Sequence, residues 1–244
     1  DFVLIDNRAG VLSFTPAQVQ AICDRKFGVG ADGLMLIEKH PSLDFNLVYY
    51  NSDGSQSLCG NGSRAAVHFA AGLGLVKSET NFNAYDGAHG AALLPAGIIR
   101  LNMNDVQGVQ NIGDDFFINT GSPHYVRFVS DVENYPVYDE GKKIRYSESY
   151  KPGGTNVNFV SLLANNTIFV RTYERGVENE TLSCGTGVTA AAIAAHFKGC
   201  TSPVTIKTLG GELAVEFKIS QSGTFYNIAL VGPAKKVFVG ELEL

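Results

Sequence analysis

The sequence predicts an α+β fold made of two pseudo-symmetric halves, in each of which a strongly curved, mostly antiparallel sheet wraps around one central helix. Three observations support this prediction. Most of the chain consists of short runs of β-branched and aromatic residues separated by Gly, Asn, Asp or Pro. Helical periodicity is confined to three segments. The motif Cys-Gly-x-Gly occurs twice, at 59–62 and 184–187, each time at the start of an alanine-rich stretch.

The expected strands are rich in Val, Ile, Phe, Tyr and Thr, and turn residues separate them. Asn165-Asn166 lies between two of these runs and predicts a hairpin turn. The strands are expected at 2–5, 33–37, 45–50, 98–102, 116–119, 126–129, 157–163, 167–173, 204–207, 212–219, 225–230 and 236–239.

Helices are expected at 15–26, 61–73 and 186–197. The first opens with Thr-Pro, an N-cap residue followed by a proline in the first helical position, and its apolar residues recur at i, i+3 and i+4. The other two are apolar nearly all round, which predicts that both are buried. Glycines follow both of them and mark their ends.

Length and composition predict a globular protein. A chain of 244 residues with 45% hydrophobic and 18% charged residues fits one large domain or two of about 120 residues each. A net charge of −5 and scattered Lys and Arg predict no nucleic-acid partner. No apolar run reaches the ~20 residues of a membrane span. We expect one half at 1–107 with 236–244, carrying Cys59, and the other at 108–235, carrying Cys184, with the active site at their interface.

The four cysteines, at 23, 59, 184 and 200, form no Cys-x-x-Cys pair, so we expect no structural zinc or other metal site. They are too few for a disulfide scaffold, which favours a reducing cytoplasmic location. The chain opens inside an apolar run without a basic region before it. We therefore expect no signal peptide, and we expect further residues to precede Asp1.

A cysteine at the N-terminus of a helix lies beside unpaired N–H groups and about half a positive charge. That position lowers the thiol pKa from about 8.5 towards the ~3.5–7.5 range, and the same N–H groups bind carboxylates. One such cysteine alone is more often inert packing. Two in matched glycine-flanked contexts favour a pair of thiols at one site, although a disulfide between them is another reading.

Two such turns that face each other would hold a substrate carboxylate between two helix N-termini, with one sulfur on each side of Cα. One thiolate would remove the Cα proton and the opposite thiol would return one, which inverts the stereocentre. Repulsion between like charges favours the singly ionised pair. The sequence has no dinucleotide fingerprint and no specific sign of a pyridoxal lysine, so no cofactor is expected. Helix dipoles and N–H groups would stabilise the carbanion.

The sequence resembles diaminopimelate epimerases over essentially its whole length. The resemblance rests on Asn51-Ser-Asp-Gly, Cys59-Gly-Asn-Gly, Tyr173-Glu-Arg-Gly and Glu180-Thr before Cys184-Gly-Thr-Gly. It implies a cofactor-independent isomerase, cytoplasmic and homodimeric. Such an enzyme interconverts LL- and meso-diaminopimelate for lysine and cell-wall precursor biosynthesis.

The resemblance also implies roles for individual residues. Cys59 and Cys184 match the acid/base pair. The family residues whose backbone holds the reacting carboxylate correspond to Gly60, Asn61, Gly185 and Thr186. Residues that hold the distal end of the substrate are matched by Asn51, Asn156 and Arg175. Polar residues near the reacting centre are matched by His124 and Glu174, and the Glu174 carboxylate also suits a substrate ammonium group.

Three positions depart from the family pattern. A Gly-Asn pair usually precedes the Asp-Phe that Asp1-Phe2 match, and that asparagine binds substrate. Ser122 stands where the better-known members carry Asn, and Gly33 stands where some carry Gln. The departures at Ser122 and Gly33 concern contacts to the substrate and not the two-cysteine reaction, whereas activity is expected to depend on the asparagine that would precede Asp1.

Two other functions remain open at this point. A proline or hydroxyproline racemase has the same fold, but its first motif usually carries His where this chain has Asn61, and it lacks the charged pair Glu174-Arg175. A non-catalytic anion-binding module would need only the helix N-termini. Each polar residue also has an ordinary alternative, because charged pairs at strand ends are usually solvated and Asn or His in loops often caps backbone groups.

Overall fold

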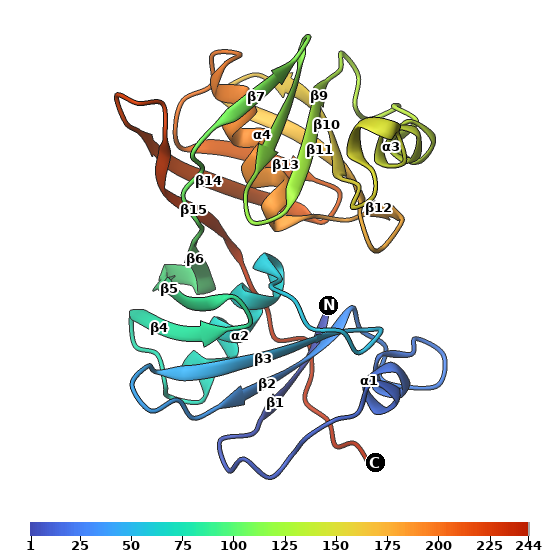
Figure 1. Cartoon of the computed structure of the whole chain (residues 1–244). Helices are drawn as coiled ribbons and strands as arrows, with labels where there is room; N and C mark the ends of the chain where they lie inside the picture. Colours follow the sequence, from blue (N-terminus) through green and yellow to red (C-terminus); the bar gives the residue numbers. More distant parts are fainter. Residues whose placement is uncertain (244) are drawn as a thin grey trace. The chain divides into compact units, whose positions relative to one another are not determined.

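The structure is a computed structural model that describes residues 1–243 (Figure 1). The chain forms two compact units. Unit 1 comprises Asp1–Leu101 and the segment from Gly232 onward, and unit 2 comprises Asn102–Val231.

Unit 1 is a mixed sheet with two helices. Strand β1 pairs parallel with β2, β2 antiparallel with β3, β3 parallel with β4, and β4, β5 and β6 follow antiparallel. In chain order its elements are β1 (Phe2–Asp6), α1 (Pro16–Cys23), β2 (Gly33–Glu38), β3 (Phe45–Asn51), α2 (Gly60–Gly72), β4 (Glu79–Ala84), β5 (Gly87–Leu94) and β6 (Ile98–Asn102), with a 3-10 turn at Pro95–Gly97.

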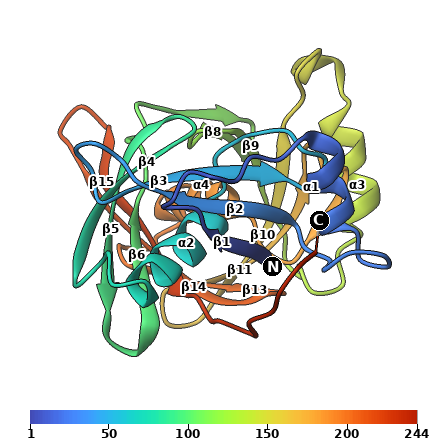
Figure 2. The ribbon, with the colours of Figure 1, turned by 90° about the horizontal axis from the view of Figure 1, so that it is seen from below.

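Strand β2 of unit 1 is buried on both faces because each face carries a helix. Leu34 and Leu36 point one way and belong to the cluster formed with α1 residues. Met35 points the other way and lies against Gly62 of α2. Helix α2 also contacts β1, β3 and β5, because the sheet of unit 1 curves around this helix (Figure 2).

Unit 2 repeats this arrangement with additions. Its sheet runs β7-β8-β9-β10-β11-β13-β14-β15, with β12 on β11; β9–β10 and β11–β13 are parallel and the other pairs are antiparallel. In chain order its elements are β7 (Val109–Ile112), β8 (Asp115–Asn119), β9 (Pro123–Phe128), α3 (Val137–Arg145), β10 (Asn156–Leu163), β11 (Thr167–Glu174), β12 (Asn179–Thr181), α4 (Gly185–His196), β13 (Val204–Thr208), β14 (Gly211–Ile219) and β15 (Phe225–Pro233), with a 3-10 turn at Glu148–Tyr150.

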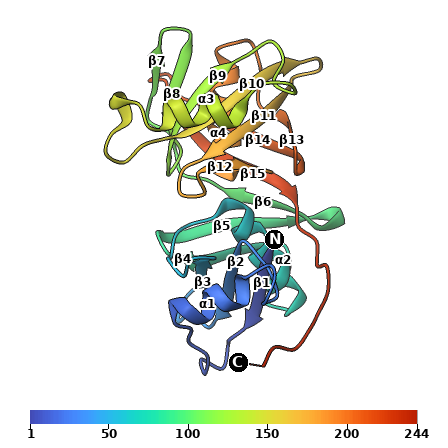
Figure 3. The same cartoon turned by 90° about the vertical axis from the view of Figure 1, so that its right-hand side faces the viewer.

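The repeat extends to element order and strand direction. The series β1-α1-β2-β3-α2-β4-β5-β6 has the same order, and the same parallel and antiparallel pairs, as β9-α3-β10-β11-α4-β13-β14-β15. Helix α4 contacts six strands and is buried nearly throughout, as its apolar sequence predicts, whereas α3 packs on the outer face of β10 and β11 (Figure 3). The α+β class and the two pseudo-symmetric halves are confirmed.

Three expectations about local structure need correction or addition. The segment 236–239 is not a strand: it pairs with no other strand within residues 1–243, and Val237 is 85% exposed. Helix α1 ends at Cys23 rather than at residue 26, because the Asp24 carboxylate accepts hydrogen bonds from the N–H groups of Lys26 and Phe27. The strands β4, β5, β7 and β12 and the helix α3 were not predicted.

Candidate active site

The two Cys-Gly-x-Gly motifs form the same local structure in the two units. Cys59 is the N-cap of α2 with φ −127° and ψ 113°, and Cys184 is the N-cap of α4 with φ −115° and ψ 114°. The carbonyl of Cys59 accepts from the N–H of Ser63 at 2.7 Å, and that of Cys184 accepts from the N–H of Val188 at 2.9 Å. Both side chains are thiols rather than disulfides. Each sulfur therefore lies at a helix N-terminus, where the dipole stabilises a thiolate.

In unit 1 a buried arginine supports the cysteine turn. Arg64 is 6% exposed and donates to the side-chain oxygen of Asn61 at 3.0 Å and to the carbonyl of Gly60 at 3.5 Å. Its Nε has no hydrogen-bond partner among residues 1–243. Burial lowers the pKa of Arg64 to about 10, and the neighbouring Cys59 acts in the opposite direction. The same attraction favours the thiolate of Cys59.

Replacing Arg64 by glutamine is expected to raise the pKa of the Cys59 thiol, because the variant keeps a donor for Asn61 but removes the positive charge. Arg64→Lys should have a smaller effect. The pH dependence of thiol alkylation, measured in a Cys184→Ala background, reads this pKa directly. The matched control is Arg8→Gln, which removes an arginine from a surface ion pair with Asp6. An alkylation profile unchanged by Arg64→Gln would contradict the electrostatic role.

Asn51, the last residue of β3, closes the loop before the first cysteine turn. Its amide nitrogen donates to the carbonyl of Ser55 at 3.2 Å and to the hydroxyls of Ser55 and Ser57 at 3.0 and 3.1 Å. The structure thus places Asn51, Cys59, Gly60 and Asn61 on consecutive parts of unit 1, from the end of β3 to the first turn of α2.

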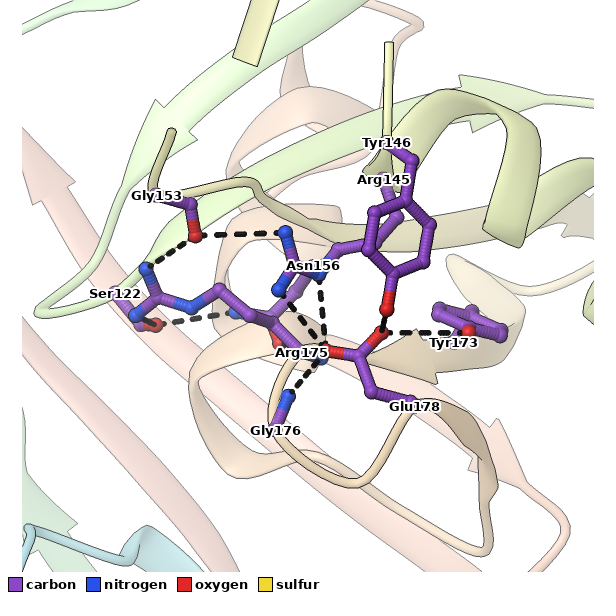
Figure 4. A network of polar contacts seen from close by, with 9 residues as sticks. All are labelled: Ser122, Arg145, Tyr146, Gly153, Asn156, Tyr173, Arg175, Gly176 and Glu178. Carbon is purple, nitrogen blue, oxygen red and sulfur yellow. Dashed lines mark hydrogen bonds and ion pairs between the residues drawn. The ribbon is translucent and has the colours of Figure 1, made fainter. Parts of the chain in front are cut away.

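In unit 2 Asn156 and Arg175 form one network (Figure 4). The Asn156 side-chain oxygen accepts from the Arg175 N–H at 2.8 Å, and its nitrogen donates to the Ser122 hydroxyl at 3.1 Å and the Pro123 carbonyl at 3.0 Å. Among residues 1–243, the exposed guanidinium of Arg175 makes only long hydrogen bonds, each 3.4 Å, to Ser122 and to the carbonyl of Gly153. Asn156 is 3% exposed and holds the backbone from which Arg175 projects.

The turn after Arg175 is held by Glu178. Its carboxylate pairs with Arg145 at 2.9 Å and accepts from Tyr146 at 2.9 Å and from the Gly176 N–H at 3.0 Å (Figure 4). Glu174, at the end of β11, accepts from the Thr181 hydroxyl of β12 at 2.9 Å. Glu174 and Arg175 are therefore not a loose solvated pair, because neighbouring groups fix the turn that carries them.

His124, near the start of β9, is completely buried and lies beside the second cysteine turn. Its Nε2 is 2.9 Å from the hydroxyl of Thr186, and that hydroxyl is 3.5 Å from the sulfur of Cys184. The Thr120 hydroxyl donates to the Thr186 carbonyl at 2.9 Å and fixes this turn. Burial, assisted by the positive charge of Arg175, lowers the pKa of His124 to about 3, so its imidazole is neutral at physiological pH.

This neutral histidine predicts a pH dependence of stability. The unfolded chain gains a proton at His124 as the pH falls through about 6.5, while the folded chain stays neutral until about pH 3. Each pH unit in that window therefore costs up to about 1.4 kcal/mol of unfolding free energy. Urea titrations from pH 7 to pH 4.5 should show a smaller slope for His124→Asn, whereas equal slopes would contradict a neutral buried imidazole.

Unit 2 carries His124 on β9, Asn156 on β10, Glu174 at the end of β11 with Arg175 after it, and Gly185 and Thr186 on α4 after its N-cap Cys184. Sequence reasoning missed Arg64 and Asn158. Arg64 is the lone acidic or basic residue, histidine aside, in the sequence of α2, and Asn158 lies two residues after Asn156 on the same face of β10. Both signals were present in the sequence.

Neither a metal site nor a membrane span emerges from the described part of the chain. Within residues 1–243, no cluster of three or more His, Cys, Asp or Glu side chains could hold a metal ion. No helix in that range is long and apolar enough to cross a membrane.

Comparison with solved structures identifies proteins of the same fold. A solved PhzF-family phenazine biosynthesis protein of Bacillus anthracis matches 94% of the chain and 89% of its own with a TM-score of 0.73 and 11% identity. A probable proline racemase of Agrobacterium radiobacter K84 matches 93% of the chain and 80% of its own with a TM-score of 0.66 and 14% identity. These likenesses show the shared fold with pseudo-symmetric halves.

Sequence similarity is more specific. A diaminopimelate epimerase of Flavobacterium psychrophilum is 50% identical over 243 residues, which cover 98% of this chain and 94% of the relative. The sequence profile of the family described as diaminopimelate epimerase matches residues 1–111 and 116–237, a range that includes both cysteine turns. The chain belongs to the diaminopimelate epimerase family.

Proposed function

We propose that this protein is an isomerase that interconverts LL- and meso-diaminopimelate in lysine and cell-wall precursor biosynthesis, with Cys59 and Cys184 as its proton acceptor and donor and without a cofactor. The observation that carries the proposal is the duplication: both cysteines are N-caps of equivalent helices, with almost the same backbone angles. A reaction that takes a proton from one side of a carbon and returns one to the other side needs two such groups.

The proposed reaction consists of two proton transfers. The substrate carboxylate binds the N–H groups at the first turns of α2 and α4, supplied by Gly60, Asn61, Gly185 and Thr186. One cysteine, as thiolate, takes the Cα proton and becomes a thiol, and the Cα–H electron pair remains on the substrate as a carbanion. The other cysteine, as thiol, gives its proton to the opposite side of Cα and becomes the thiolate. The configuration at Cα is inverted and the reverse reaction starts from the exchanged protonation states.

The distal amino-acid group of diaminopimelate explains the remaining polar residues. Arg175 offers a guanidinium to its carboxylate, and the adjacent Glu174, near the reacting centre, offers a carboxylate to a substrate ammonium group. Asn156 holds the backbone of Arg175 and lies next to this pair, so we assign it, with Asn51, to the distal end of the substrate. Proline has no second charged group, which makes the Glu174-Arg175 pair unnecessary for a proline racemase.

We further propose that the protein is cytoplasmic, where its thiols stay reduced, and that it acts as a homodimer. Light scattering tests the oligomeric state: a monomeric mass at micromolar concentration would contradict the dimer.

Hydrogen exchange tests the proposed activity. LL-diaminopimelate incubated with the full-length protein in deuterated water should gain deuterium at Cα and yield the meso isomer, both visible by NMR and chiral chromatography. Neither exchange nor isomer formation would overturn the proposal. Parallel incubation with L-proline separates the alternatives, because exchange with proline but not with diaminopimelate would support the proline racemase.

A further inference from the structure

A row of polar side chains, three of them buried, lies behind the second cysteine turn. It crosses the neighbouring strands β11, β10 and β9 and reaches α4 through Thr172, Asn158, His124 and Thr186. Thr172 is 2% exposed, and Asn158 and His124 are 0% exposed. We propose that this row is an oriented hydrogen-bond relay, in which Asn158 is a positioning residue that sets the tautomer of His124 and thereby directs the Thr186 hydroxyl hydrogen to the sulfur of Cys184. The inference rests on the proposed function of Cys184.

The direction of the relay is fixed at Asn158. Its Nδ2 lies 3.0 Å from the carbonyl oxygen of Tyr125, and a carbonyl can only accept, so this atom is the amide nitrogen rather than the oxygen. The side-chain oxygen of Asn158 consequently faces Thr172, whose hydroxyl donates to it at 2.9 Å.

The second hydrogen of the amide nitrogen determines the state of His124. The Nδ2 of Asn158 is 3.2 Å from Nδ1 of His124, and because Nδ2 donates, Nδ1 must accept and carries no proton. A neutral imidazole then has its hydrogen on Nε2, which donates to the Thr186 hydroxyl at 2.9 Å. Buried among these partners, His124 has no lone pair left to take a proton from a thiol.

The last step of the relay reaches the sulfur. The Thr186 hydroxyl accepts from His124 and keeps its own hydrogen for donation, and Cys184 Sγ lies 3.5 Å away. A hydrogen bond donated to a thiolate stabilises the charged form and lowers the thiol pKa. The relay therefore favours ionisation of Cys184 through a donated hydrogen bond.

A close approach at Gly187 supports this arrangement independently. A Cβ at Gly187 would lie 2.4 Å from the side-chain oxygen of Asn158, so the amide fits only because the fourth motif position is glycine. The equivalent glycine in unit 1, Gly62, faces Met35 instead. Met35 is paired with Tyr49 on β3, just as Asn158 is paired with Thr172 on β11. The Asn158–Thr172 pair of the relay is therefore replaced by Met35 and Tyr49 in unit 1.

Histidine NMR tests the tautomer directly. In protein labelled with nitrogen-15 at histidine, His124 should show a protonated Nε2 and an unprotonated Nδ1 that do not change between pH 5 and pH 8. In Asn158→Leu, which is similar in size but cannot donate, the signal should move towards a mixture of tautomers. A wild-type His124 with a protonated Nδ1, or an imidazolium at pH 7, would overturn the relay.

Thiol alkylation in a Cys59→Ala background tests the effect on Cys184. Asn158→Leu should raise the apparent pKa of Cys184 and, with Cys59 restored, lower kcat roughly 10- to 100-fold, as expected for the loss of one hydrogen bond to a charged group. KM should change little. An unchanged alkylation profile in a folded Asn158→Leu protein would overturn the proposal.

A second pair of variants covers the case in which Asn158→Leu does not fold. Thr172→Val removes the donor that holds the Asn158 oxygen and should shift the alkylation profile in the same direction, whereas Thr172→Ser keeps the hydroxyl and should restore it. Equal profiles for the two would contradict the relay. Neither NMR nor alkylation requires turnover, so a wild-type protein that shows the predicted tautomer but no epimerisation refutes the proposed function and leaves the relay standing.

Discussion

Replacing either Cys59 or Cys184 by alanine is expected to abolish the interconversion of LL- and meso-diaminopimelate while leaving the fold intact. Each substitution removes one of the two groups that we propose exchange protons with Cα, and positioned acid/base groups contribute about 10²- to 10⁴-fold to rate. Turnover in both directions, followed by chiral chromatography, should fall at least that far in each single variant.

The other two cysteines provide the control. Cys23 lies in the cluster around α1, and burial raises the pKa of its thiol; burial likewise raises the pKa of Cys200, which packs beside the core of unit 2. Cys200→Ala should retain normal turnover. If a protein lacking Cys59 or Cys184 epimerised at the wild-type rate, the two-base scheme would be wrong.

Alanine at Gly187 is expected to be far more damaging than alanine at the equivalent Gly62. At Gly187 the new methyl group would lie 2.4 Å from the Asn158 oxygen and 3.2 Å from the Cβ of Cys184. Asn158 is held by its hydrogen bonds and cannot move without breaking them. At Gly62 the clash is with the end of the flexible Met35 side chain, 2.0 Å away, which can adopt another rotamer.

Overpacking of a rigid site costs about 1–3 kcal/mol, so Gly187→Ala should lower the unfolding free energy by that amount and displace the sulfur of Cys184. Urea unfolding measures the first effect, and the rate of Cys184 alkylation measures the second. Gly62→Ala serves as the matched comparison. Equal losses in the two variants would show that Asn158 does not restrain its site more than Met35 does.

The repeated element order of the two units accounts for elements that strand and helix propensity did not predict. Helix α3 was not predicted because five of its nine residues are charged and only Val137, Tyr138 and Ile144 are large and apolar, yet it occupies the place of α1 in the second copy. Strands β4 and β5 correspond to β13 and β14 in the same way. These two strands were not predicted because Asn, Gly and Ala have low strand propensity. The buried residues of β4 nevertheless alternate, at Thr80, Phe82 and Ala84.

Candidate site residues could be predicted where the residue type itself suggests the chemistry. They could not be predicted where the role depends on which atoms the fold brings together. A cysteine before a glycine-rich turn predicts a thiol at a helix N-terminus, and both cysteines are N-cap residues in the structure. Asn158 acts through the atoms it reaches on β9 and β11. Those contacts depend on strand register, which the spacing of motifs along the chain does not determine.

The two cysteine turns have the same backbone conformation, but different residues surround them. This difference matters because a duplicated fold with identical turns would give its two thiols identical properties. Two identical copies would give both thiols the same affinity for a proton, and neither would be predisposed to start as base. Here one copy places the buried cation of Arg64 beneath its cysteine, and the other places an uncharged chain of donors behind its own. The two units thus share the backbone of the cysteine turn but stabilise the two thiolates by different means, a charge at Cys59 and a hydrogen bond at Cys184.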